Sequence, residues 1–173
     1  MRNLYLVTGT TKGLGAALAE VLAANDANHV FSMSRFDIEG QDPANIFVDF
    51  SIPESIEPAF KKFVDAIAEQ TYARAVLINN AGMVAPVGPF TEINAATLRI
   101  NLGVNLLAPM ILMRLFANAT RAIAAERLII NISSGAAKRA VPGWAAYCTA
   151  KAGLEMARVR LRWKHPPRIW IHR

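Results

Sequence analysis

Cysteine is nearly absent from this sequence, since Cys148 is the only one in 173 residues. No disulfide can form within the chain, so a hydrophobic core must hold the fold, and we expect a reducing, cytoplasmic setting. Charged residues are also scarce at 18%, whereas 53% of the residues are hydrophobic. This balance excludes an intrinsically disordered chain, and the length leaves room for one compact core and not for two.

Long apolar runs are missing as well. The stretch Leu4–Val7 is too short for the apolar part of a secretory signal, and the charge-free run at 75–91 is interrupted by two Asn, two Gly and two Pro. A helix that spans a bilayer needs about 20 predominantly apolar residues. We therefore expect neither a secretory leader nor a membrane partner.

Acidic residues are absent from the last part of the chain. Residues 157–173 contain six of the 19 basic residues, which leaves 13 basic against 13 acidic residues in residues 1–156. The formal net charge of +6 thus describes a short basic tail and not a nucleic-acid-binding face. We divide the chain into a neutral domain at 1–156 and a basic tail at 157–173, and we expect no nucleic-acid partner.

Short β-type runs alternate with segments of helical period, and Gly, Pro, Asn or Ser marks each switch. This order is typical of βαβ units. We expect strands at residues 4–8, 29–34, 45–49, 75–79 and 127–133. The last of these is apolar on both faces, as in a parallel sheet that helices cover above and below. The sequence therefore predicts an α/β fold with a doubly wound parallel sheet, a Rossmann fold, whose chemistry lies at the carboxyl ends of the strands.

Four helices are expected between and after these strands. They begin near Gly13, Pro53, Ala95 and Ala145. The third extends over 95–119, and Pro109 is expected to kink it or to break its hydrogen-bond ladder locally. In the first helix, four apolar residues form a stripe that is expected to face the sheet: Leu14, Leu18, Val21 and Leu22.

A glycine-rich segment, Thr8–Gly15, joins the first expected strand to the first expected helix. Its glycines permit a tight turn and let a pyrophosphate approach the backbone, while the helix N-terminus supplies N–H groups and a positive dipole. An ordinary βα turn that uses glycine only for its φ angles would show the same pattern. The residues of this segment that we expect to bind a cofactor are Gly9, Thr11, Lys12, Gly13 and Leu14.

Ser34 and Arg35 follow the second expected strand, where a dinucleotide-binding fold meets the adenosine ribose. An acidic residue there would bond a free 2′-hydroxyl, whereas Arg35, helped by Lys12, suits a 2′-phosphate by charge and by its forked geometry. We therefore expect NADP(H) in preference to NAD(H). Two solvated surface cations are the alternative interpretation, and Asp37 is the nearby carboxylate that argues against this preference.

Motifs of one enzyme family occur in order along the chain. They are the glycine-rich loop, Asn79-Asn80-Ala81-Gly82, a Ser134 placed thirteen residues before a tyrosine, and Tyr147-x-x-x-Lys151. With them the chain resembles the short-chain dehydrogenase/reductase family over residues 1 to about 156. Segments 132–138 and 143–148 look like its benzil reductase and sepiapterin reductase branch. The resemblance implies an NADPH-dependent oxidoreductase that reduces a ketone or diketone carbonyl.

The resemblance also implies roles for the residues around the tyrosine. Tyr147 would protonate the carbonyl oxygen, and Lys151, one turn further on the same helix face, would supply the positive charge that a phenol needs for this work near neutral pH. Both residues would also bind the cofactor, with the Lys151 ammonium at the hydroxyls of the nicotinamide ribose. A Tyr and a Lys one turn apart are otherwise common on an amphipathic helix. Ser134 would bond the substrate carbonyl, whereas Ser133 is expected to pack or to bond locally. Trp144 either walls a pocket for a flat substrate or packs in the core.

Further residues follow from the same resemblance. Asn105 would hold a water that links the lysine to solvent, whereas Asn101 is expected to face solvent or to bond its own helix. Asp49 and Phe50 resemble the pair that contacts the adenine, although an Asp at a strand end is often only a turn former. The segment that would line the adenosine side is Asn80, Ala81 and Gly82.

The end of the chain departs from the family pattern. Family members continue through a sixth strand with a Pro-Gly turn, a helical segment that covers the substrate, and a seventh strand. Residues 168–172 are either that sixth strand or foreign sequence, since the composition changes abruptly after residue 157. We expect a C-terminally truncated reductase. Related enzymes form dimers by packing their long helices together, so we expect a homo-oligomer through these helices. The alternative is a catalytically silent fragment that keeps a partial nucleotide site.

Overall fold

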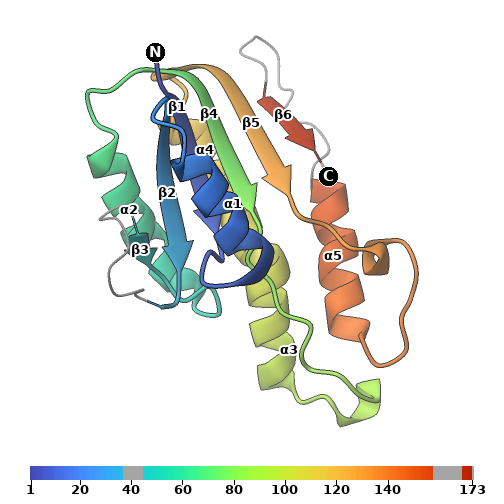
Figure 1. Cartoon of the computed structure of the whole chain (residues 1–173). Coiled ribbons are helices and arrows are strands. Elements are labelled where there is room, and N and C mark those ends of the chain that lie inside the picture. Colours follow the sequence, from blue (N-terminus) through green and yellow to red (C-terminus); the bar gives the residue numbers. More distant parts are fainter. Residues whose placement is uncertain (37–44, 158–168, 173) are drawn as a thin grey trace.

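The computed structural model describes residues 1–36, 45–157 and 169–172. Asp37 and the basic residues between 158 and 168 lie outside the described residues. A six-stranded parallel sheet of order β3-β2-β1-β4-β5-β6 forms the centre of the protein (Figure 1). Its strands are β1 (Asn3–Thr8), β2 (Asn28–Ser34), β3 (Asn45–Phe47), β4 (Tyr72–Asn79), β5 (Ala124–Asn131) and β6 (Ile169–His172). The predicted parallel α/β fold is confirmed.

Helices cover the sheet from both faces (Figure 1). They are α1 (Gly13–Ala23), α2 (Ile56–Ala66), α3 (Ala95–Leu102), α4 (Ala108–Ala119) and α5 (Ala145–Ala157). The larger core lies against α2, α4 and α5 and includes the fully buried Phe63 and Phe116, whose ring centroids are 6.1 Å apart. A smaller cluster lies on the α1 face. This packing holds the carboxyl ends of β1, β2, β4 and β5 at one edge of the sheet, where the functional site is expected.

The apolar stripe predicted for α1 is only half correct. Leu18 and Leu22 pack against the smaller cluster, whereas Leu14 is 55% exposed and Val21 is 71% exposed. The part of α1 that packs on the sheet is therefore limited to the side of the helix with Leu18 and Leu22.

The hydrogen-bond ladder of the helical run 95–119 is interrupted just before Pro109, as the sequence predicted. Residues Gly103–Leu107 form a π-helical turn, η3, between α3 and α4. Pro109 follows in the first turn of α4 and has no N–H to offer the carbonyl of Asn105, four residues earlier. The whole run is long and apolar enough to cross a membrane by length and composition, although it contains Arg99 and Arg114 and is therefore not a charge-free run. Half of its most apolar part is buried in the protein, because α4 packs against α2 and the sheet.

Several strands end earlier than the sequence predicted. β3 stops at Phe47 and not at Asp49, and β5 stops at Asn131 and not at Ser133. The N–H of Ile132 still donates to the carbonyl of Asn79 at 2.9 Å, after which the chain leaves the sheet. Beyond β5 at the edge, β6 pairs in parallel with residues Arg127–Ile130.

Candidate active and nucleotide site

The glycine-rich loop between β1 and α1 is shaped by close backbone packing. Gly9 (φ +70°) and Gly15 have no room for a side chain, because a Cβ would lie 2.8 Å from the Cα of Ala81 and 2.2 Å from the carbonyl oxygen of Gly9, respectively. Gly13 (φ +60°) instead faces open space, with no other atom within 4 Å of a Cβ position. Lys12 precedes α1 without a side-chain cap. The first N–H groups of α1 therefore lack a side-chain acceptor and favour an anion.

Asn80 and Thr8 join the end of β4 to this loop. The Thr8 hydroxyl accepts the N–H groups of Asn80 and Ala81, each at 3.0 Å. The side-chain amide of Asn80 donates to the carbonyls of Thr8 and Gly9 at 3.0 and 3.1 Å. The amide N–H groups of Asn80 are thus used by the loop backbone, so this side chain fixes the shape of the loop.

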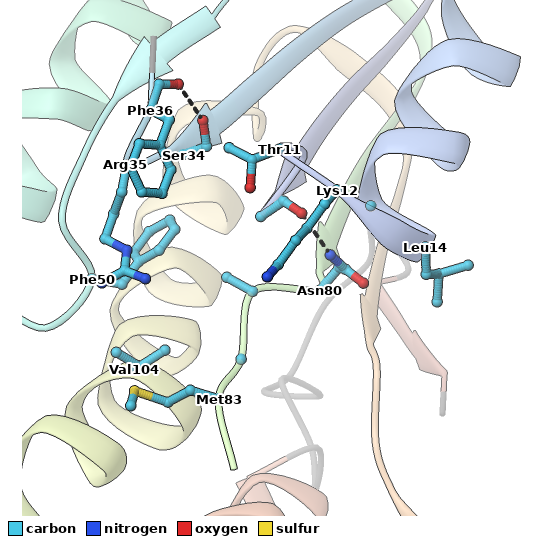
Figure 2. A pocket seen from close by; sticks show the side chains of 14 residues that line it. Thr11, Lys12, Leu14, Ser34, Arg35, Phe36, Phe50, Asn80, Met83 and Val104 are labelled. Atoms are coloured by element: carbon cyan, nitrogen blue, oxygen red, sulfur yellow. Dashed lines mark hydrogen bonds between the residues drawn. The ribbon is translucent and has the colours of Figure 1, made fainter. Parts of the chain in front are cut away.

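A cavity of about 400 Å³ opens beside the loop (Figure 2). Ten of the predicted cofactor residues line it: Gly9, Thr11, Lys12, Leu14, Ser34, Arg35, Phe50, Asn80, Ala81 and Gly82. Four lining residues were not predicted: Gly15, Phe36, Met83 and Val104. Gly15 ends the glycine-rich segment, which was a signal for it. The apolar side chains of Phe36, Met83 and Val104 carry no chemical signature, and only their places beside Arg35, Gly82 and Asn105 could have indicated them.

Four predicted cofactor residues are absent from this lining: Gly13, Asp49, Tyr147 and Lys151. Gly13 lies at the open start of α1. The Asp49 carboxylate accepts the N–H and the hydroxyl of Ser51 at 2.9 and 2.8 Å, the pattern of a turn former. Asp49 thus shapes the segment that carries Phe50.

Arg35 and Phe36 form the far end of the cavity from Leu14 (Figure 2). The guanidinium carbon of Arg35 lies 5.9 Å from the centroid of the Phe36 ring. Ser34 is buried, and its hydroxyl donates to the carbonyl of Phe36 at 3.0 Å. The Ser34 hydroxyl proton is therefore used within the turn, whereas the side chains of Lys12 and Arg35 are exposed cations.

Helix α5 carries the predicted tyrosine and lysine. Lys151 is 4% exposed, its ammonium donates to the carbonyl of Ile132 at 2.8 Å, and it lies 5.7 Å from the centroid of the Tyr147 ring. Tyr147 is half-buried and meets Trp144 edge-on at 5.7 Å between ring centroids. Burial lowers the pKa of Lys151 below its usual 10.5, because a buried ammonium loses its hydration.

The pKa shift of Lys151 leads to a prediction about stability. The folded protein releases this proton at a lower pH than the unfolded chain, so the unfolded chain binds more protons between the lowered pKa and 10.5. We expect the free energy of unfolding of the wild type to rise with pH in this window, relative to that of Lys151→Met. Denaturant unfolding at several alkaline pH values measures the difference, and Lys138→Met, an exposed lysine, is the control. A difference that stays constant with pH would contradict the prediction.

Ser133 and Ser134 differ in what they bond. The Ser134 oxygen accepts the N–H of Ala136 at 3.2 Å and caps the 3-10 turn η4 (Gly135–Ala137). Its own hydroxyl proton thus stays available to a substrate oxygen. Ser133 was expected to pack or to bond locally, but its hydroxyl donates to a carboxylate oxygen of Glu155 on α5 at 2.8 Å. The bond spans 22 residues, so sequence proximity gave no sign of it.

The two asparagines of the π-helical region both hold the segment after Gly82. Asn105 is fully buried and accepts the N–H of Met83 at 3.1 Å, while its amide group donates to the carbonyl of Met83 at 2.7 Å. Asn101 was expected to face solvent or to bond its own helix, and this was wrong. It is fully buried, and its amide group donates to three successive carbonyls, those of Met83, Val84 and Ala85.

Gly82 connects the nucleotide cavity with the residues of α5. A Cβ on Gly82 would lie 3.0 Å from the side-chain oxygen of Asn105 and 3.7 Å from the ammonium of Lys151. Since Gly82 lines the cavity, Lys151 lies at the cavity's border although it does not line it. Within the described residues, no cluster of His, Cys, Asp and Glu has the arrangement of a metal site.

Comparison with known proteins relates this arrangement to one family. The sequence profile described as short chain dehydrogenase matches residues 3–169. The benzil reductase ((S)-benzoin forming) of Bacillus subtilis (strain 168) is 36% identical over 155 residues, which cover 89% of this chain and 64% of that protein. The chain thus spans less than two thirds of the length of this relative.

Solved structures agree with this relationship. A short-chain dehydrogenase/reductase from Burkholderia vietnamiensis superimposes with a TM-score of 0.84 and 30% identity, over 99% of this chain and 83% of that one. A metagenomic short-chain oxidoreductase in complex with NADP is 31% identical, with a TM-score of 0.75 over 90% of this chain and 73% of that one. An oxidoreductase from Brucella ovis with a partially ordered NAD is 27% identical, with a TM-score of 0.77 over 91% and 75%.

Proposed function

The chain belongs to the short-chain dehydrogenase/reductase family, and on this premise we propose that it is an NADPH-dependent carbonyl reductase. The observation that carries the proposal is the meeting of Lys151, Asn105 and Gly82 at the border of the glycine-rich cavity. It brings the Tyr147–Lys151 face of α5 to the place where the reactive end of a dinucleotide would lie.

The residues of the cavity fit a dinucleotide phosphate. The open space at Gly13 lets an anion approach the backbone, and the first turn of α1 offers N–H groups without a side-chain cap. Arg35 and Lys12 are exposed cations at the adenosine side, and none of the described residues that line the cavity is acidic. This charge favours a 2′-phosphate over a free 2′-hydroxyl. Phe36 and Phe50 add flat apolar surfaces on which an adenine can pack.

The side chains around α5 have complementary roles in the proposed reaction. The nicotinamide of the bound dinucleotide would supply the hydride that the carbonyl carbon accepts. Tyr147 donates its phenolic proton to the carbonyl oxygen, and the ammonium of Lys151 favours the phenolate that this transfer leaves. The free hydroxyl proton of Ser134 bonds the same oxygen and orients the carbonyl. Asn105 holds the Met83 backbone beside Lys151.

The substrate side favours a flat, apolar carbonyl compound. Trp144 stands edge-on to Tyr147, and the N–H of Gly88 donates to the carbonyl of Gly143 at 3.0 Å, which joins the segment between β4 and α3 to the segment before α5. An aromatic wall next to the proton donor suits an α-diketone with ring substituents. The name of the Bacillus subtilis relative supports benzil as the first substrate to test.

Exposed apolar side chains on the long helices support the predicted pairing of two copies. Leu107 is 44% exposed and Met110 is 45% exposed, and they lie three positions apart in the helical run. Residues three apart share one helix face. A homo-oligomer is therefore part of the proposal.

Titration with dinucleotide followed by substrate tests the proposed function. We expect NADPH to bind the purified chain, seen as a change in nucleotide fluorescence, and benzil added to the same sample to consume the reduced nicotinamide absorbance. Binding without consumption would reject the reductase and favour a silent nucleotide-binding protein. A folded sample that binds neither NADPH nor NADH would reject both.

A further inference from the structure

The residues that follow β5 are held to α5 at two points. The ammonium of Lys151 donates to the carbonyl of Ile132, and the hydroxyl of Ser133 donates to the carboxylate of Glu155, each at 2.8 Å. The next residue is Ser134, whose hydroxyl is free to meet the substrate. The two bonds therefore join the chain that carries Ser134 to the helix that carries Tyr147 (Figure 1).

Glu155 extends the line of functional side chains on α5 by one turn. Tyr147, Lys151 and Glu155 are spaced four residues apart, so they lie on one side of the helix. Tyr147 meets the substrate in the proposed reaction, whereas Lys151 and Glu155 both bond the segment between β5 and η4. One side of α5 thus holds both the proton donor and the backbone that carries the carbonyl-binding serine.

The bond from Ser133 constrains the direction of Ser134. The backbone of Ser134 is extended, with φ −151° and ψ 155°. Successive side chains of an extended chain point to opposite sides of the chain. When the Ser133 side chain is fixed by Glu155, the side to which the Ser134 side chain points is therefore fixed as well. The bonds of Ile132 to Asn79 and to Lys151 hold the backbone before Ser133 but not the Ser133 side chain. The bond to Glu155 fixes that side chain as well.

We propose that Glu155 is a positioning residue that sets the place of Ser134 relative to Tyr147 by holding Ser133. The inference rests on the proposed function, since it assigns a role within the same site. Glu155 touches neither substrate nor dinucleotide in this role. It acts by keeping the Ser134 hydroxyl and the Tyr147 phenol at the spacing that one carbonyl oxygen requires.

Replacement of Glu155 by alanine tests the role through the chemical step. A misplacement of about 1 Å in a reacting geometry can lower the rate about 100-fold. We expect Glu155→Ala to lower kcat about 10-fold to 100-fold, with little change in the KM for NADPH. Ser133→Ala should have the same effect, and the double variant should be no slower than either single one. Glu155→Gln keeps an acceptor oxygen for Ser133 and should restore most of kcat.

A deuterium-labelled cofactor separates positioning from a loss of stability. If Glu155→Ala impairs the chemical step, the isotope effect on kcat with NADPH deuterated at the transferred position should be larger than in the wild type. Glu126→Ala is the matched control, because it removes the ion pair with Arg74 at the other end of β5. It should leave kcat and the isotope effect unchanged when the rate is normalised to the folded fraction. Far-UV circular dichroism and NADPH binding measure that fraction.

The outcomes distinguish this inference from the proposed function. Wild-type kcat in Glu155→Ala, or additive effects of Ser133→Ala and Glu155→Ala, would overturn the positioning role while leaving the reductase in place. Loss of kcat in Glu155→Gln equal to that in Glu155→Ala would also overturn it. If the wild type shows no turnover that depends on Tyr147, the proposed function fails and the positioning role fails with it.

Discussion

Tyr147→Phe is expected to lower kcat for benzil reduction by about 100-fold to 10,000-fold, because a positioned proton donor contributes about that much to a reaction rate. The substitution removes one oxygen and keeps the ring, so the edge-on contact with Trp144 stays. The NADPH cavity is also unaffected, since Tyr147 does not line it. The dissociation constant for NADPH should therefore stay within a few-fold of the wild-type value. Steady-state absorbance measurements give kcat, and fluorescence titration gives the dissociation constant.

Tyr5→Phe is the matched control for this change. Tyr5 lies on β1 and packs beside the smaller cluster on the α1 face, away from α5. It should leave kcat unchanged. A Tyr147→Phe variant that reduces benzil at the wild-type rate would show that the proton comes from elsewhere, and it would remove the main support for the proposed mechanism.

The local motifs of the site could be predicted from the sequence because each depends on a short stretch of chain. A tight turn needs glycine at Gly9 whatever follows later, and residues four apart on a helix share a face, as Tyr147 and Lys151 do. The alternation of strands and helices is likewise a local pattern, and it predicted the parallel α/β fold. Local patterns therefore account for most of the cavity lining.

The contacts that complete the site depend on tertiary structure and could not be predicted in this way. Asn101 bonds the carbonyl of Met83 across 18 residues, and Asn105 bonds the N–H of Met83 across 22 residues. The bond between Ser133 and Glu155 spans 22 residues. A mid-helix asparagine carries no sign of such a partner, because its side chain bonds equally well to solvent or to its own helix.

The π-helical turn has both a sequence signal and a tertiary cause. The sequence predicted a local break in the long helix from Pro109, and the turn at Gly103–Leu107 lies directly before that proline and contains Asn105, whose carbonyl the proline cannot bond. The side chain of Asn105 also donates to the carbonyl of Asn101 at 3.0 Å. A side chain that enters the hydrogen-bond ladder of its own helix widens the helix locally. The sequence thus predicted the break through the proline, whereas the contribution of the buried Asn105 could not be predicted.

Arg35→Ala is expected to raise the KM for NADPH about 10-fold to 100-fold and to leave the KM for NADH within about threefold, because hydrogen bonds to charged groups contribute about 1.5–3 kcal/mol. Arg35 is exposed, so solvent screening places the effect toward the lower end of that range. Lys12 still attracts the 2′-phosphate in this variant, so removal of both cations should weaken the binding of NADPH further. Steady-state kinetics with each dinucleotide at low and at high salt measure the change.

The salt dependence makes this prediction specific to charge. The preference of the wild type for NADPH should shrink as ionic strength rises, whereas that of Arg35→Ala should change little. Arg121→Ala is the control, since this exposed arginine precedes β5 at the amino end of the strand, opposite the site. If Arg35→Ala weakened the binding of NADPH and of NADH equally, Arg35 would act through its packing with Phe36 and not through the 2′-phosphate. The cofactor preference would then have to come from another residue of the cavity.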